Sequence, residues 1–210
     1  MRRSAASAIA TVLLGLSPAN AAPWSLQVGA GPTFPAGGAD FQEGLATGFV
    51  GTVAAGTAIS PSLEILVRGT YSDLPRDDEG ALLVAGIDQR PFRVLEISGG
   101  TLTAWDALGE LRYALSPGAS VVHPYVLGAA GLTSYRYERV DIAYAYAGHT
   151  WPTTIPGQET TAACLAGGGG VHFAIHEWLE LTVETRLHVV LRGDGALWSV
   201  PLWLEVAVSP

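Results

Sequence analysis

The segment 179–189 alternates strictly between two kinds of residue. Leucine, valine and threonine fill its odd positions, and charged or hydrogen-bonding residues such as Glu184 and Arg186 fill the even ones. Because successive side chains of a β-strand point to opposite faces, this period predicts a strand with one apolar and one ionic face. The same pattern recurs in residues 63–71, 101–114 and 198–208.

Weaker alternation elsewhere brings the number of expected strands to eight, adding residues 24–34, 44–58, 123–137 and 161–175. The expected strands have about 10 to 15 residues, whereas strands of globular proteins usually have about 5 to 6. A tilted strand needs about 9 to 11 residues to cross the hydrocarbon of a bilayer. The aromatic residues near the strand ends would form the interfacial girdle of a membrane barrel: Trp24, Phe34, Tyr71, Tyr113, Tyr125, Tyr135, Tyr137, Trp178 and Trp198.

The expected connections alternate between short and long. Short turns are expected at residues 60–62, 116–120 and 176–178. The opposite rim would carry residues 35–43, 72–100, 138–160 and the short hairpin 192–195. Short turns on one rim and longer loops on the other are typical of an outer-membrane barrel, whose short turns face the periplasm.

These features predict an all-β fold, an eight-stranded antiparallel up-and-down transmembrane β-barrel formed by residues 23–210. Closing the sheet satisfies every backbone polar group without water. A soluble β-barrel or sandwich would instead bury the apolar faces. A second alternative is a spanning helix at residues 44–63, which carry no charge, although Phe49, Val53 and Ile59 line up as the outer face of a strand.

Residues 1–22 are expected to be a cleaved signal peptide. Arg2 and Arg3 precede an apolar run from Ala5 to Leu16, and small residues follow at the spacing that signal peptidase reads. We therefore expect export and an outer-membrane location, with outer-membrane lipid and the barrel-insertion machinery as partners.

The composition excludes several classes of protein. The net charge of −8 disfavours a nucleic-acid partner, which requires a basic surface. The single cysteine excludes an intramolecular disulfide framework. Only 14 % of the residues are charged, against roughly 25 % in soluble domains.

The sequence resembles the small outer-membrane β-barrel family of the OmpA and OmpX type. The resemblance lies in residues 123–131, which resemble the family's Pro-Tyr strand opening, in the glycine-rich stretch 166–173, and in the final strand at 200–204. It implies an eight-stranded barrel in the outer membrane with a variable role.

A structural network of polar residues is expected inside the barrel, where each buried charge needs a partner. Its predicted members are Glu64, Arg68, Asp106, Glu110, Arg112, Glu180, Glu184, Arg186 and Glu205. If Asp194 and Gly195 form a two-residue turn, Glu184 faces Glu205 and Arg186 lies diagonal to Glu205. A gated or proton-sensitive plug is the alternative to a purely structural network.

No catalytic, cofactor or metal site is predicted. His172 and His188 both point inward, but His172 is expected beside Thr182, well away from His188, with no inward serine next to either. Cys164 is expected to be a small inward filler residue. The protein is therefore not expected to be an enzyme.

The long loops are the expected place for an external ligand. Residues 144–152 are aromatic enough to contact a sugar or a protein, or to anchor at the membrane interface. The acidic run 77–79 could hold calcium or simply be solvated. Residues 192–194 match the Arg-Gly-Asp adhesion tripeptide, which a tight hairpin also explains.

The expected function is that of an integral outer-membrane barrel with a structural or surface-interaction role. Alternatives are a small pore or transport protein for ions or an apolar ligand, and a lipid-modifying outer-membrane enzyme.

Overall fold

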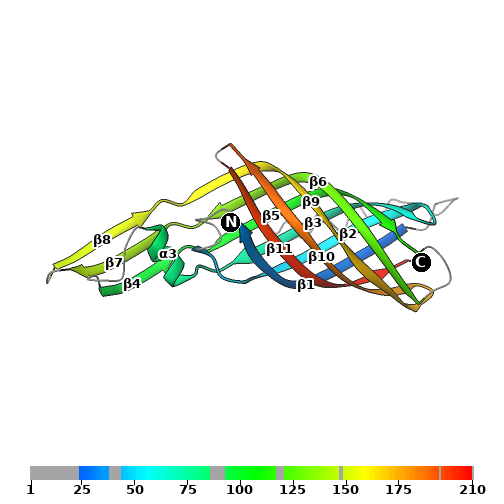
Figure 1. The fold of residues 1–210 in the computed structure, drawn as a ribbon, viewed down its shortest axis with the longest axis horizontal. Helices are drawn as coiled ribbons and strands as arrows, with labels where there is room; N and C mark the ends of the chain where they lie inside the picture. Colours follow the sequence, from blue (N-terminus) through cyan, green and yellow to red (C-terminus); the bar gives the residue numbers. More distant parts are fainter. Residues whose placement is uncertain are drawn as a thin grey trace, which may run out of the picture.

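The computed structural model describes residues 24–37, 44–85, 93–116, 121–146, 149–193 and 195–209. Within these ranges, eight long strands close into an antiparallel barrel in the order β1-β11-β10-β9-β6-β5-β3-β2 (Figure 1). The strands are β1 (Trp24–Gly37), β2 (Gly48–Ser60), β3 (Leu63–Leu74), β5 (Leu102–Ala114), β6 (Val122–Tyr137), β9 (Gln158–His176), β10 (Leu179–Arg192) and β11 (Gly195–Val208).

The expected transmembrane barrel is confirmed, because each barrel strand pairs with the barrel strands before and after it in the chain, and β1 pairs with β11. Each of the eight expected strands corresponds to one of these strands. In this ring, β3 lies four places from β10 and β5 lies four places from β11, so each of these pairs faces across the interior. The expected signal peptide lies outside the described residues.

The two faces of the barrel strands differ sharply in exposure. On β3, Val67 is 69 % exposed whereas its neighbour Arg68 is 0 % exposed. On β11, Leu202 and Leu204 are exposed and Glu205 is fully buried. A water-soluble barrel would place these aliphatic side chains inside. The observed arrangement suits a hydrocarbon surrounding, with the ionic faces collected in the interior.

Three of the expected girdle aromatics lie elsewhere, and one of them, Tyr137, is partly buried against the core clusters of the barrel and the extension. Tyr125 and Tyr135 are each only 3 % exposed, because both point into the barrel from β6. Their position near a strand end suggested the girdle. The direction of a side chain, however, depends on whether the residue occupies an odd or an even position along β6, its parity, because successive side chains point to opposite faces. Other predicted members, including Trp24, Tyr113 and Trp178, are exposed as expected.

The uncharged segment 44–63 does not form a spanning helix. It contains β2, whose register against β3 pairs Val53 with Gly69 and Thr57 with Ile65. Phe49, Val53 and Ile59 are exposed, as expected for the outer face of a strand. No helix in the described part of the chain combines the length and apolar character needed to cross a bilayer.

A folded extension projects beyond the long-loop end of the barrel (Figure 1). It contains a three-stranded sheet in the order β4-β7-β8 and a short helix. The elements are β4 (Arg93–Gly99), β7 (Val140–Tyr146), β8 (His149–Ile155) and α3 (Asp78–Val84). Leu82, Val140 and Ile142 form its buried core. Residues 72–100 and 138–160 were expected to be loops, so this extension was not predicted.

The closed barrel has a direct biochemical consequence. We expect the mature chain to require detergent after membrane extraction, and to migrate faster on a gel when it is not heated, because the closed sheet resists unfolding by detergent alone. Gel mobility with and without heating, after membrane fractionation, is the measurement. A freely water-soluble monomer without any amphiphile would contradict the outward apolar face.

Candidate functional site

The barrel interior contains a cluster of six charged side chains, here termed the interior charge cluster. Its members come from facing walls of the barrel and are Arg68, Glu110, Arg112, Glu184, Arg186 and Glu205. Each side chain is at most 2 % exposed. Three guanidinium groups therefore face three carboxylates in a region without bulk water, so the cluster is balanced if all six groups are ionised.

The ion pairs of the cluster cross the barrel interior. Arg68 on β3 donates to Glu110 on the neighbouring β5 at 2.9 Å and also pairs with Glu205 on β11. Arg112 on β5 contacts Glu184 on β10 at 2.7 Å. Arg186 on β10 returns to Glu110 at 2.9 Å. Opposite walls are thereby connected by charge-assisted hydrogen bonds, which are among the stronger protein hydrogen bonds.

Aromatic and amide side chains fill the space around the charges. Trp203 lies beneath two guanidinium groups, with Arg186 at 4.7 Å and Arg68 at 5.4 Å from its ring centroid. The Tyr125 hydroxyl donates to Glu184, and the Gln27 amide oxygen accepts from Arg112 at 2.8 Å. These contacts leave the centre of the barrel packed with side chains, as expected for an eight-stranded barrel.

The predicted register of the last hairpin is wrong by two residues. Arg192 pairs with Gly195, so that Glu205 lies opposite Thr182 and Glu184 lies opposite Trp203. The prediction had assumed a turn at residues 194–195, but β10 runs on to Arg192 and β11 begins at Gly195. Glu205 therefore pairs with Arg68 across the interior, not with Arg186 on the adjacent strand.

Three predicted network residues lie outside the interior charge cluster. Glu64 accepts from Ser25 at 2.8 Å and lies 3.8 Å from Arg112, nearer the short-turn end. Glu180 is partly exposed at that end, with its carboxylate 3.8 Å from the His172 ring. Asp106 lies toward the long-loop end, where its nearest ion-pairing partner among the described residues is His188.

A cavity of about 320 Å³ opens at the short-turn end of the barrel. Glu64, Arg112, Tyr125 and His172 are among the residues that line it. The interior charge cluster lies between this cavity and the long-loop end. Within the described residues, the cavity therefore forms a vestibule at the short-turn end, and the interior charge cluster closes its inner end.

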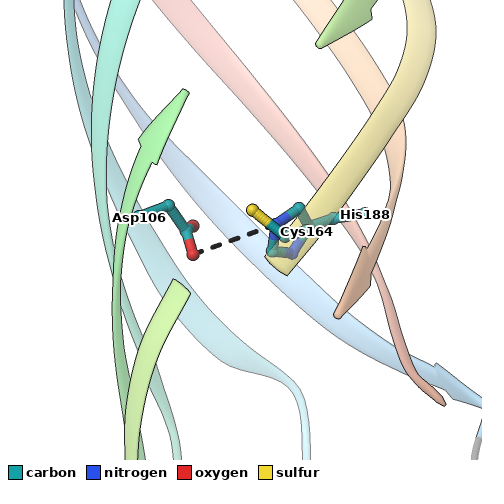
Figure 2. A group of neighbouring side chains, drawn as sticks. All are labelled: Asp106, Cys164 and His188. Carbon is teal, nitrogen blue, oxygen red and sulfur yellow. Dashed lines mark ion pairs between the residues drawn. The ribbon is translucent and has the colours of Figure 1, made fainter. Parts of the chain in front are cut away.

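The two interior histidines are far apart in register, as predicted. His172 lies opposite Thr182, and its Nδ1 is 2.6 Å from the Thr182 hydroxyl. His188 lies instead beside Asp106 and Cys164, as Figure 2 shows. This group was not predicted, because its members come from β5, β9 and β10 and only the barrel registers reveal that they are neighbours.

The extension orders its polar residues locally. The Asp77 carboxylate caps α3 by accepting from the Glu79 amide, and Asp78 pairs with Arg76 at 2.7 Å. The acidic run 77–79 is thus partly used as a helix cap and an ion pair. At the start of β7, Arg139 donates to the Asp141 carboxylate and holds the pKa of Asp141 below its ordinary value.

Exposed aromatic side chains gather on the β7-β8 hairpin. Tyr146 lies opposite His149, and Tyr144 lies opposite Trp151, which is 51 % exposed. The hairpin lies beyond the barrel (Figure 1), so these aromatics are not part of the girdle around the barrel. The Arg-Gly-Asp prediction is not tested, because Asp194 lies outside the described residues.

The chain is similar to several solved structures. Neisserial surface protein A has a TM-score of 0.57 and 16 % identity, over 89 % of this chain and 97 % of that chain. A major outer membrane protein from Thermus thermophilus has a TM-score of 0.46 and 16 % identity, over 91 % and 100 % of the two chains. Ail, the attachment invasion locus protein of Yersinia pestis, has a TM-score of 0.40 and 12 % identity, over 89 % and 95 %.

No family model and no curated protein matches the sequence. The likeness to Neisserial surface protein A is one of fold. It confirms the expectation, taken from the resemblance in the sequence, that the chain has the fold of the small eight-stranded outer-membrane barrels.

Removal of one charge from the interior cluster should strongly destabilise the barrel. Arg68→Ala removes the closest partner of Glu205 and one of the three arginines that pair with Glu110, which leaves the buried cluster one positive charge short. We therefore expect a loss of about 3 to 5 kcal/mol in the free energy of unfolding. Urea unfolding of barrels refolded in phospholipid vesicles measures this loss. Glu180→Gln, at a partly exposed site, is the control and should change it by less than about 0.5 kcal/mol. Equal stability of Arg68→Ala and the native chain would refute a structural role for the cluster.

Proposed function

We propose that this chain is an integral outer-membrane protein that acts in surface interaction, with the barrel as a closed anchor and the extension as the binding part. The main evidence is the contrast between the barrel and the extension. The barrel centre is occupied by paired charges, whereas the long-loop end bears a folded sheet with its own buried core and exposed aromatics.

The proposed location draws on three observations. The fold is that of outer-membrane barrels, the outer face is aliphatic, and the sequence begins with residues typical of a signal peptide. Partners under this proposal are the outer-membrane lipid and the machinery that inserts barrels. Because short turns of such barrels face the periplasm, the extension would lie outside the cell.

The extension has properties that favour a macromolecular ligand. Tyr146 and Trp151 present large, rigid aromatic surfaces, which form contacts at a low cost in conformational entropy. The sheet also has two edge strands, β4 and β8, whose backbone groups could pair with an extended segment. We assign no catalytic role to the interior charge cluster, since its charged groups are engaged with one another.

Ion transport is the second candidate function, favoured by the vestibule of about 320 Å³ at the short-turn end. We expect no conductance steps from the native chain in planar bilayers, because paired side chains fill the barrel centre. Arg186→Ala should also remain silent, since the other members of the cluster and Trp203 still block the path. A general porin is the positive control. Steady unitary steps from the native chain would favour the pore over the anchor.

Removal of the hairpin tests the binding role. A variant in which residues 139–156 are replaced by Asn-Gly keeps the β6-β9 pairing at Tyr137 and Gln158 but lacks β7 and β8. Both chains, in lipid nanodiscs, are applied to an array of glycans and extracellular-matrix proteins. We expect the native chain to bind at least one component, and the hairpin deletion and Trp151→Ala to weaken that binding by about tenfold or more.

The barrel itself supplies the control for this experiment. The deletion variant should keep its heat-dependent gel mobility, because within the described ranges the deleted strands pair only with each other and with β4. Ligand binding that survives the deletion unchanged would contradict the proposed role of the extension. So would a native chain that binds none of the array components.

A further inference from the structure

Three metal-ligating side chains meet inside the barrel, on the long-loop side of the interior charge cluster. Asp106 on β5, Cys164 on β9 and His188 on β10 each offer a ligand atom, and these atoms all lie within 4.8 Å of one another. Figure 2 shows the three side chains converging from different strands. Cys164 is the only cysteine of the chain and is buried.

The Asp106 carboxylate lacks the kind of partner that the carboxylates of the interior charge cluster have. Its side chain is only 7 % exposed, and the closest nitrogen of an ion pair is Nε2 of His188 at 3.8 Å. Its hydrogen bonds come from the hydroxyls of Thr70 and of Thr133, the latter at 2.6 Å. By contrast, Glu110, Glu184 and Glu205 each pair with an arginine. A buried carboxylate without a compensating cation is costly.

His188 supplies a second, independent observation. Its Nε2 atom is buried and has no hydrogen-bond partner among the described residues, a rare condition for a buried polar atom. His188 also lines a cavity of about 30 Å³, which is room for about one water molecule. The nearby Arg186 donates to Glu184 and Glu110 through its Nε and Nη2 atoms, and its Nη1 atom is buried without a hydrogen-bond partner among the described residues.

We propose that Asp106, Cys164 and His188 form a binding site for a divalent metal ion of the zinc class. Thiolate, imidazole and carboxylate are the ligands that Zn²⁺ takes in proteins, and the ion would use the cavity for a water as fourth ligand. Bond lengths of about 2.0 to 2.3 Å place donor atoms roughly 3 to 4 Å apart, so small side-chain rotations suffice.

The charges balance when the ion binds. The Cys164 thiol releases its proton to solvent and becomes a thiolate, so that thiolate and carboxylate together offset the two positive charges of the metal. Thr70 and Thr133 hold the carboxylate in position, as outer partners of metal ligands commonly do. Metal binding would join β5, β9 and β10 inside the barrel. The metal site does not depend on the proposed role of the extension.

Cobalt provides the sharpest test, because a thiolate bound to Co²⁺ gives a charge-transfer absorption band and a tetrahedral site gives strong visible bands. Metal-free chain is refolded in detergent micelles, and Co²⁺ is added both during and after refolding, so that slow entry cannot hide a site. We expect one equivalent of Co²⁺ to bind with both bands and one equivalent of Zn²⁺ to displace it.

Variants locate the site. Cys164→Ser should abolish the charge-transfer band, and His188→Ala and Asp106→Asn should each weaken metal affinity by more than about 100-fold, because each removes a ligand. Thr133→Val should weaken it by about tenfold, as expected for an outer partner. His172→Ala, the other interior histidine, is the matched control and should bind as the native chain does.

Heat-dependent gel mobility establishes that each variant is folded. A folded native chain that gives no charge-transfer band under either condition overturns the site. So does a band that persists in Cys164→Ser, or a loss of affinity in His172→Ala equal to that in His188→Ala.

Discussion

Backbone hydrogen bonding in a medium without water is the constraint on which this structure depends. An unpaired amide or carbonyl in hydrocarbon costs several kcal/mol, so a sheet that crosses a bilayer must close on itself. Here β1 pairs with β11, and no barrel strand in the described chain is left as an edge. Closure then divides every strand into a lipid side and an interior side, and the alternating sequence supplies each side with suitable residues.

Closure with eight strands also brings ionic side chains into a narrow interior, where each buried charge needs a partner. The interior of such a barrel is just wide enough for its own side chains, and the even positions of β10 bring ionic groups into it. The paired residues lie on facing walls, as in Arg68 with Glu205 and Arg112 with Glu184. The ion pairs that compensate the buried charges therefore also connect opposite sides of the barrel. Asp106 lies outside this balance, and its nearest ion-pairing partner in the described chain is His188.

Most of the barrel could be predicted from the sequence because strand periodicity depends on neighbouring residues alone. The outward aliphatics of β10 and β11 and the inward Arg68 and Glu110 all follow from parity. Parity does not determine how strands are shifted against each other, however. The predicted register of the last hairpin therefore differs by two residues from the one in the structure. For the same reason, the pairing of Glu205 with Arg68 was not predicted.

The missed features share a dependence on distant contacts. The sheet β4-β7-β8 joins segments that lie more than 40 residues apart in the chain, and its core forms only when Leu82 of α3 meets Ile142. Residues 164 and 188 come together with Asp106 through three strand registers, each of which would have to be known first. Tyr125 and Tyr135 lie near strand ends, but their direction depends on the parity of β6, which its weak pattern left uncertain.

Fluorescence quenching by brominated lipids tests most directly which side of the strands faces the membrane. Two single-tryptophan chains are compared in the same vesicles: one retains only Trp203, and the other carries only Leu204→Trp at the adjacent position of β11. Trp203 is buried in the interior and Leu204 faces outward. Bromine on the acyl chains should quench the tryptophan at position 204 strongly and the one at 203 weakly. Stronger quenching at 203, or none at either position, would contradict the account.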